Sequence, residues 1–220
     1  GKRVWIYPKK PKGRFHNGRI IVSAVLLLIM ILLPFIRVDD HPLFLFNIFD
    51  REFILFGIVF GPQDFHIFVL AFITIIVFIV LFTAIFGRVF CGWACPQTVF
   101  MEMVFRKIEY LIEGNYRQQI ALDNSPMSAG KFFKKALKHF VFISLAFFIS
   151  HLFMAYIIGV DEVVNIVSQP PSEHLSGFIG VLFFSGLFYF VFARFREQAC
   201  TIVCPYGRLQ SVLLDQNSLV

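Results

Sequence analysis

The sequence predicts an all-α integral membrane protein with four transmembrane helices, arranged as two parallel two-helix repeats, plus a cytoplasmic amphipathic helix. Three observations predict this fold class. Hydrophobic residues make up 58% of the 220 residues and charged residues 15%, which leaves too little polar surface for a soluble globule. Four apolar stretches are each long enough to cross a bilayer core of roughly 30 Å. A cysteine motif occurs twice, once after the second stretch and once after the fourth.

The four apolar stretches cover residues 20–36, 65–86, 140–160 and 175–193. None contains Asp, Glu, Lys or Arg, which are costly at the centre of a membrane helix. The first stretch is the shortest and carries Pro34 near its end, so we expect that helix to cross with little tilt or to end early. Arg37 follows it directly, without a small-residue cleavage site, so we expect a retained helix and not a signal peptide.

Basic residues are distributed unevenly between the segments that join these stretches. Segments 1–19, 87–139 and 194–220 hold 18 of the 20 Lys and Arg residues, and segments 37–64 and 161–174 hold the other two. This bias predicts a multi-pass protein of a bacterial inner (cytoplasmic) membrane with both termini and the central loop in the cytoplasm. The lipid bilayer is therefore the expected partner, and the net charge of +6 indicates topology and no nucleic-acid partner.

The outer segment 37–64 contains two short apolar runs, residues 43–49 and 53–60. They are separated by Asp50, Arg51 and Glu52, and three adjacent charges exclude a membrane span there. We expect a hairpin or an interfacial element at the outer leaflet.

The central loop has apolar residues at helical spacing, which predicts an amphipathic helix at the cytoplasmic interface that ends near Gly114. We expect i,i+4 ion pairs between Glu102 and Arg106 and between Glu113 and Arg117. The expected apolar stripe consists of Val99, Phe100, Met103, Val104, Ile108, Leu111 and Ile112. Met101 and Met103 could bind Cu(I), but their positions fit packing better.

The order of these elements divides the chain into five parts. Residues 1–19 form a basic cytoplasmic tail, and residues 20–96 form the first two-helix unit with the outer hairpin and the first cysteine motif. Residues 97–139 form the cytoplasmic amphipathic helix and loop. Residues 140–205 form the second two-helix unit with the second motif, and residues 206–220 begin a cytoplasmic region.

Every cysteine belongs to the duplicated motif Cys-x-x-x-Cys-Pro, whose two copies start 109 residues apart on the predicted cytoplasmic side. The four cysteines are Cys91, Cys95, Cys200 and Cys204. Proline disfavours helical angles in the preceding residue, so each second cysteine should cap a helix that begins at Pro96 or Pro205. The helix dipole, together with Arg88, Arg196 and Arg208, would favour thiolates, the form that binds metals and exchanges electrons.

Four interpretations of these cysteines are open. A structural disulfide is disfavoured in a reducing cytoplasm. The second interpretation is a zinc clasp between the two halves. The third is that the thiols are buried and inert. The fourth is redox or soft-metal work with copper or an iron–sulfur site, and we favour it because a chance recurrence in both halves is improbable. The cysteines alone do not distinguish copper from iron.

His151 lies in the middle of the third apolar stretch, where an ionisable side chain is a functional candidate. Haem ligation would need a partner histidine on a second span, and His66 is the one available. We expect instead a hydrogen bond from His151 to Ser144, to Ser185 or to a quinone.

Longer motifs surround the cysteines: FGRVFCGWACPQTV at residues 86–99 and CPYGRLQ at residues 204–210. Together with Ile108-Glu109 and Ile112-Glu113-Gly114, they closely resemble the FixG/CcoG/RdxA accessory proteins of cbb-type cytochrome oxidase. The resemblance runs from Arg3 to the end of the chain. In that family, a cytoplasmic ferredoxin domain with cluster-binding cysteines follows, so we expect this chain to be a membrane-domain fragment of a longer protein.

The resemblance implies a membrane-bound iron–sulfur electron-transfer protein that acts in cytochrome oxidase assembly. It implies 4Fe-4S clusters, mainly in the ferredoxin domain, and an oxidoreductase of the cupric reductase type that converts its substrate Cu(II) to Cu(I). By motif match, the redox or metal role passes to Cys91, Cys95, Cys200 and Cys204. The implied partners are the cbb-type oxidase or its copper-delivery factors, with the electron donor unknown. Two alternatives are a non-catalytic assembly scaffold with a zinc or thiol clasp, and a quinol-linked electron-transfer subunit of a periplasmic reductase.

Overall fold

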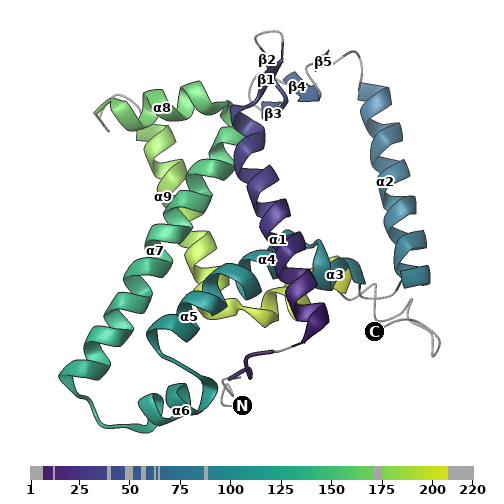
Figure 1. Cartoon of the computed structure of the whole chain (residues 1–220). Coiled ribbons are helices and arrows are strands. Elements are labelled where there is room, and N and C mark those ends of the chain that lie inside the picture. Colours follow the sequence, from purple (N-terminus) through teal and green to yellow (C-terminus); the bar gives the residue numbers. More distant parts are fainter. Residues whose placement is uncertain are drawn as a thin grey trace.

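The computed structural model describes residues 7–11, 13–38, 41–47, 52–55, 58–61, 63, 65–86, 89–170 and 175–207, and these are mostly helical (Figure 1). The α-helices are α1 (Arg14–Leu32), α2 (Phe65–Phe86), α3 (Val89–Trp93), α4 (Pro96–Val99), α5 (Arg106–Ile112), α6 (Tyr116–Asn124), α7 (Ala129–Ile158), α8 (Val160–Ser168) and α9 (Leu175–Tyr189). A 3₁₀ turn, Leu33–Phe35, follows α1, and there are π-helical segments at Phe100–Phe105, Phe190–Phe195 and Ala199–Val203.

Short antiparallel strands lie between α1 and α2, so the all-α prediction is incomplete in this segment. The strands are β1 (Arg37–Val38), β2 (His41–Pro42), β3 (Phe44–Asn47), β4 (Glu52–Leu55) and β5 (Ile58–Phe60). β1 pairs with β2, and β3, β4 and β5 form a three-stranded sheet in that order. The register pairs Phe46 with Phe53 across β3 and β4, so the two apolar runs form a hairpin, one of the two expected alternatives.

Three helical stretches of the described chain are long and apolar enough to cross a membrane: Arg14–Phe35, Ala129–Ile158 and Leu175–Phe195. α2 has the predicted bounds, but its apolar part within the described residues, Val69–Thr83, is shorter than a full span. α1 begins at Arg14 and α7 at Ala129, earlier than expected. The first extension carries Arg and the second carries Lys, and both residue types are good helix formers.

α7 is the central helix of the molecule. It packs against α9 along its length, against β3 and α8 at one end and against α5 at the other. The buried core beside α7 consists of Met101, Phe105, Phe142, Ile149 and Phe192. The Phe105 ring stacks on Phe192 with 4.6 Å between the centroids and meets Phe142 edge-on at 4.9 Å. This aromatic packing joins the segment after the first cysteine motif to the segment before the second.

The central amphipathic helix runs from α4 through the π-helical segment Phe100–Phe105 into α5. It ends at Ile112, just before Gly114 (φ 84°), as expected. The predicted apolar stripe is partly wrong, because Leu111 is exposed whereas Phe105 and Glu109 are buried. A π-helical turn contains more residues than an α-helical turn, so it rotates every later side chain around the axis. Met101 and Met103 are buried, which agrees with packing.

The segment after α7 is partly helical, because Val160–Ser168 form α8. The expectation of a serine partner for His151 is wrong. The ring of His151 lies with Nδ1 2.8 Å from the carbonyl oxygen of Phe147 on its own helix, and the ring packs on Phe147. That local contact satisfies a polar ring nitrogen within one turn of α7, without the predicted serine partners. The outer acidic residues Asp39 and Asp40 lie outside the described residues.

Candidate functional site

The two cysteine motifs have the same local backbone. Cys95 has φ −63° and ψ 121°, and Cys204 has φ −70° and ψ 114°. The N–H of each donates to the carbonyl oxygen five residues earlier, at 3.0 Å for Cys95 and 2.9 Å for Cys204. Helices begin at Pro96 and Pro205, as the sequence predicts. Each second cysteine is therefore an extended residue between two helical turns, which turns the chain sharply at the motif.

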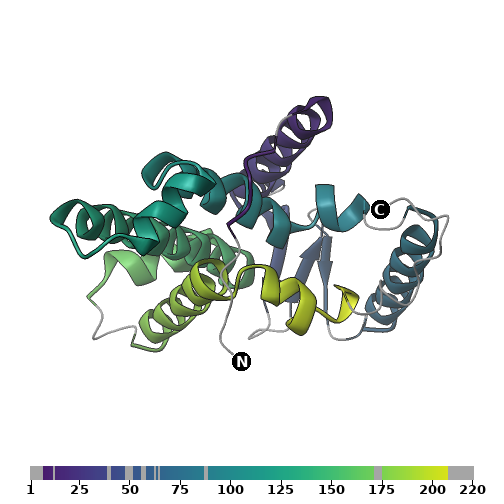
Figure 2. The same ribbon diagram turned by 90° about the horizontal axis from the view of Figure 1, so that it is seen from below.

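The chain brings the two motifs together at one end of the molecule. After α9, the chain passes beneath the molecule toward α3 and α2, as seen from below in Figure 2. The hydroxyl of Tyr206, two residues after Cys204, shares a hydrogen bond with Thr83 near the end of α2. The Tyr206 ring also meets Phe90 edge-on, with 6.1 Å between the centroids. Phe90 immediately precedes Cys91, so this ring contact links the two motifs.

Gly207 permits a close approach inside the second motif. A Cβ atom at this position would lie 2.3 Å from the carbonyl oxygen of Cys200, which is too short for any side chain. The equivalent position after the first motif is Thr98, and Gly92, inside the first motif, has open space where a Cβ would lie. The turn at the second motif therefore depends on a glycine at residue 207, whereas the turn at the first accommodates a side chain at the equivalent position.

All four cysteines are partly buried. Burial raises the pKa of Cys200, and the nearby Cys95 and Cys204 thiols and Glu197 raise it further. Cys200 is thus within electrostatic range of a cysteine from the other motif. The raised pKa differs from the expected stabilised thiolate, because burial favours the neutral thiol, and the Arg196 guanidinium is paired with Glu109. Arg88 and Arg208, the other two expected neighbours, lie outside the described residues.

The two motifs offer a donor set of four cysteines, which an iron–sulfur cluster can use. Within the described parts of the chain, no three His, Cys, Asp or Glu side chains are grouped closely enough to hold one ion. A tetrahedral zinc site needs its sulfurs about 2.3 Å from one common metal. In a 4Fe-4S cluster each of four thiolates binds its own iron, so the sulfurs lie farther apart, and four cysteines are the usual ligand set. Several neighbouring thiolates also repel one another unless a cation offsets their charge.

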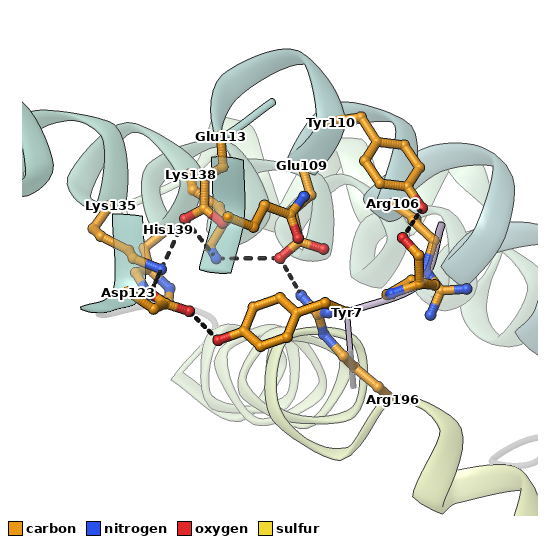
Figure 3. A network of polar contacts seen from close by, with 12 residues as sticks. Tyr7, Arg106, Glu109, Tyr110, Glu113, Asp123, Lys135, Lys138, His139 and Arg196 are labelled. Carbon is orange, nitrogen blue, oxygen red and sulfur yellow. Dashed lines mark hydrogen bonds and ion pairs between the residues drawn. The ribbon is translucent and has the colours of Figure 1, made fainter. Parts of the chain in front are cut away.

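A buried network of charges holds the two motifs in place (Figure 3). Glu109 of α5 lies 2.7 Å from Arg196, which precedes the second motif, and 3.2 Å from Lys138 of α7. All three side chains are at least nine-tenths buried. Arg106 of α5 pairs with Glu197, the next residue along the second segment. We call Arg106, Glu109, Arg196 and Glu197 the charge clamp.

A second cluster of ion pairs extends this network toward α6. Lys138 also lies 2.8 Å from Glu113, and Lys135 bridges Glu113 at 3.1 Å and Asp123 at 2.7 Å. The predicted pair of Glu102 with Arg106 is present. The predicted pair of Glu113 with Arg117 is wrong, because α5 ends before Arg117 and the chain turns at Gly114. Arg117 contacts Tyr116 instead.

The sequence does not predict the ion pairs of Glu109, Lys138 and Arg196, and it assigns Arg196 to the thiolates instead. Glu109 falls within a motif of the family resemblance, but its burial follows from the π-helical turn that precedes it. Arg196 has φ 46°, a strained value for a residue with a side chain, and its N–H donates to the carbonyl oxygen of Val191. An arginine four residues before a Cys-x-x-x-Cys motif was a signal, although its partner could not be read from the sequence.

Two family models match the chain, and each covers one cysteine motif. A "4Fe-4S binding domain" model matches residues 68–115, and a "4Fe-4S dicluster domain" model matches residues 195–220. No solved structure matches the chain significantly.

Several curated proteins are similar along the whole chain. Nitrogen fixation protein FixG of Rhizobium meliloti is 33% identical over 228 residues, which cover 100% of this chain and 42% of FixG. Protein RdxA of Cereibacter sphaeroides is 33% identical over 99% of this chain and 47% of its own length, and protein RdxB of that organism is 27% identical over 99% and 46%. The chain thus spans less than half the length of these relatives. On the shared motifs and this end-to-end similarity, the chain belongs to the FixG/RdxA family.

Proposed function

We propose that this chain is the membrane electron-transfer module of an iron–sulfur protein that acts in cytochrome oxidase assembly. The observation that carries the proposal is the meeting of the two cysteine motifs, in which Tyr206 of the second contacts Phe90 of the first and Thr83 at the end of α2. The charge clamp supports it, because four side chains dock the segments that carry the motifs onto each other. The proposal treats Cys91, Cys95, Cys200 and Cys204 as the ligands of a 4Fe-4S cluster.

The topology that we propose has four spans, formed by α1, α2, α7 and α9, with both termini in the cytoplasm. Contacts of the N-terminal segment support it. The hydroxyl of Tyr7 donates to Asp123 of α6, and the hydroxyl of Tyr110 of α5 donates to the carbonyl oxygen of Pro8. These contacts support a location of the start of α1 and of the α5–α6 region on one side of the membrane. The number of crossings between them is then even, so if α1 spans the membrane, α2 spans it as well.

Each pair of spans then ends in one cysteine motif, α2 in the first and α9 in the second. This is the repeat arrangement that the sequence predicts, and the matching backbone of Cys95 and Cys204 supports it. Both motifs lie at the end of the helices that also holds α5 and α6, which the basic residues assign to the cytoplasm.

The proposed reaction is the one-electron reduction of Cu(II) to Cu(I). Cys91, Cys95, Cys200 and Cys204 would hold the cluster, which would supply one-electron chemistry when bound, and a ferredoxin-type donor in the longer protein would provide the electron. No proton is transferred in this exchange. The ring contact of Phe90 with Tyr206 and the charge clamp would fix the two motifs relative to each other.

The test uses the full-length protein, purified in detergent, with Cys91→Ser and Cys204→Ser as the variants and Thr201→Ala as the matched control. Thr201 lies between the cysteines of the second motif, and its hydroxyl contacts only local carbonyl oxygens among the described residues. We expect both cysteine variants to insert into the membrane but to lose Cu(II) reduction, together with the cluster signal in electron paramagnetic resonance. Thr201→Ala should keep both.

Other outcomes separate the alternatives. Equal reduction rates in the wild type and both cysteine variants would refute the redox role of these thiols. Stoichiometric zinc without any redox-active signal would instead support a scaffold with a zinc clasp. Reduction of the cluster by quinol, without Cu(II) turnover, would support a quinol-linked subunit.

A further inference from the structure

A charged cavity lies between α6, α7 and the continuation of α9, apart from the cysteine motifs. Its volume is about 470 Å³. The cavity is lined by Asp123, Lys135, Lys138, His139, Phe142, Tyr189, Phe190, Ala193 and Arg194. The α7 residues recur at three- and four-residue spacing, so they form one face of the helix, and Figure 3 shows Lys135, Lys138 and His139 on this face beside Asp123.

One part of the cavity wall is cationic. Lys135, Lys138 and Arg194 contribute three positive charges, and Asp123 contributes one negative charge. The two lysines also contact Glu109 and Glu113 behind the wall, which fixes their positions. Arg194 is exposed and lines the cavity at its outer side.

The other part of the wall is aromatic. Phe142 is buried and Phe190 is 49% exposed on the outer side of the segment that follows α9. The hydroxyl of Tyr189 lies 2.8 Å from Nδ1 of His139, which joins the two helices and leaves a polar pair between the cationic and apolar parts. The wall therefore changes from charged to apolar across one cavity.

This change coincides with the edge of the apolar helices. Arg194 lies at the end of the apolar stretch Leu175–Phe195, and Lys138 lies where α7 changes from a lysine-rich turn to an apolar run. A phospholipid has the same profile, with a phosphate at the boundary and acyl chains beyond it. Basic pockets between membrane helices bind anionic headgroups, and guanidinium groups bind phosphate well.

We propose that this cavity binds the headgroup of an anionic phospholipid, with its phosphate at Arg194 and Lys135 and its acyl chains along Phe190. The volume fits a glycerophosphate headgroup and not a whole lipid, so the chains remain in the bilayer. The bound lipid would bridge α7 and the segment that leads to the second cysteine motif. This proposal does not depend on the bound metal or on the reaction.

The test measures lipid binding to the full-length protein in a neutral detergent, by native mass spectrometry and by the shift of the unfolding midpoint. Phosphatidylglycerol is compared with phosphatidylcholine for the wild type, Arg194→Gln and Lys134→Gln. Lys134 is the matched control. It is exposed on the same turn of α7 as Lys135, but it does not line the cavity. We expect phosphatidylglycerol to bind about fivefold more weakly to Arg194→Gln and unchanged to Lys134→Gln.

An equal loss in both variants would show attraction to surface charge alone and would overturn the proposal. Equal binding of phosphatidylcholine and phosphatidylglycerol would overturn it too. A third arm uses inorganic phosphate and glycerol 3-phosphate at millimolar concentration. If these stabilise the wild type as much as the lipid does, the cavity takes a soluble anion and the lipid proposal fails. Arg194→Lys keeps the charge and should recover part of the binding, which separates ligand contact from a folding defect.

Discussion

Glu109 is the residue on which the contact between the two halves of the chain depends most. Its carboxylate is buried beside two cations, Arg196 and Lys138. We predict that Glu109→Gln lowers the free energy of unfolding by about 3–5 kcal/mol, because it removes the negative charge from a buried group of ions. Chemical unfolding of the purified protein in detergent, followed by tryptophan fluorescence, would measure this change.

The control for this substitution is Asp161→Asn. Asp161 lies 2.7 Å from Arg37, so an ion pair is broken in both variants, but this pair is mostly exposed. The expected cost there is about 0–1 kcal/mol. A similar loss in both variants would mean that burial does not decide the strength of the charge clamp.

The same residue predicts how stability depends on pH. Burial raises the pKa of Glu109, but hydrogen bonds and charges from Arg196 and Lys138 outweigh burial and bring the pKa below its ordinary value of 4.5. The unfolded chain binds a proton more readily than the folded chain, so this stabilisation is complete above about pH 4.5 and is lost as the pH falls through the folded pKa. We expect the denaturant concentration at the unfolding midpoint to decrease as the pH is lowered below about 4.5. This decrease should be smaller in Glu109→Gln.

Some of the site residues can be predicted from the sequence and others cannot. All four cysteines, the cap positions of Cys95 and Cys204 and the pair of Glu102 with Arg106 follow from local rules that need only neighbouring residues. The pairs of Glu109 with Arg196 and of Glu113 with Lys138 do not. These partners are far apart in the chain, so their contact depends on how the helices pack.

At the scale of elements, the turn at the second motif depends on the close approach of Gly207 to the carbonyl oxygen of Cys200. We predict that Gly207→Ala destabilises the protein by about 1–3 kcal/mol, because the new Cβ would lie 2.3 Å from the carbonyl oxygen of Cys200 and the backbone must move. The matched variant is Gly92→Ala, where the space is open within a helix, and it should be neutral or stabilising by about 0.5–1 kcal/mol.

Thiol chemistry gives this prediction a second measurement. The rate at which iodoacetamide modifies Cys200 should change in Gly207→Ala and remain unchanged in Gly92→Ala. Equal effects of the two alanines on stability and on this rate would contradict the close approach of Gly207.

The helices themselves were predicted with uneven success, for physical reasons. The bounds of α2 agree with the sequence, because polar and turn residues flank a continuous apolar run on both sides. The stripe of the central helix was predicted for regular α-helical spacing and fails after Phe100–Phe105, where the helix is π-helical. Tertiary packing of Phe105 between Phe142 and Phe192 accompanies that turn, and no local propensity predicts it.

At the scale of the whole molecule, the charge distribution and the hydrogen bonds support the same arrangement by independent routes. The excess of Lys and Arg in alternate segments predicts the orientation in which the chain inserts into the membrane. The contacts of Tyr7 with Asp123 and of Tyr110 with Pro8 concern which segments meet after folding. The hydrogen bonds place the N-terminal segment beside α5 and α6, and the charge distribution agrees with our proposal that these segments share one side of the membrane. A chain in which α1, α7 and α9 spanned the membrane and α2 did not would separate them.

This difference between three and four spans can be measured with single cysteines introduced into a variant that lacks the four native ones. Lys9→Cys and Met127→Cys lie at exposed positions before α1 and before α7, and Val167→Cys lies in exposed α8. A membrane-impermeant maleimide should label the first two only in inverted vesicles and Val167→Cys only in right-side-out cells. If α2 did not cross the bilayer, Lys9→Cys and Met127→Cys would be labelled from opposite sides. The Tyr7 hydrogen bond could then not form, and the two cysteine motifs could not meet on one face of the membrane.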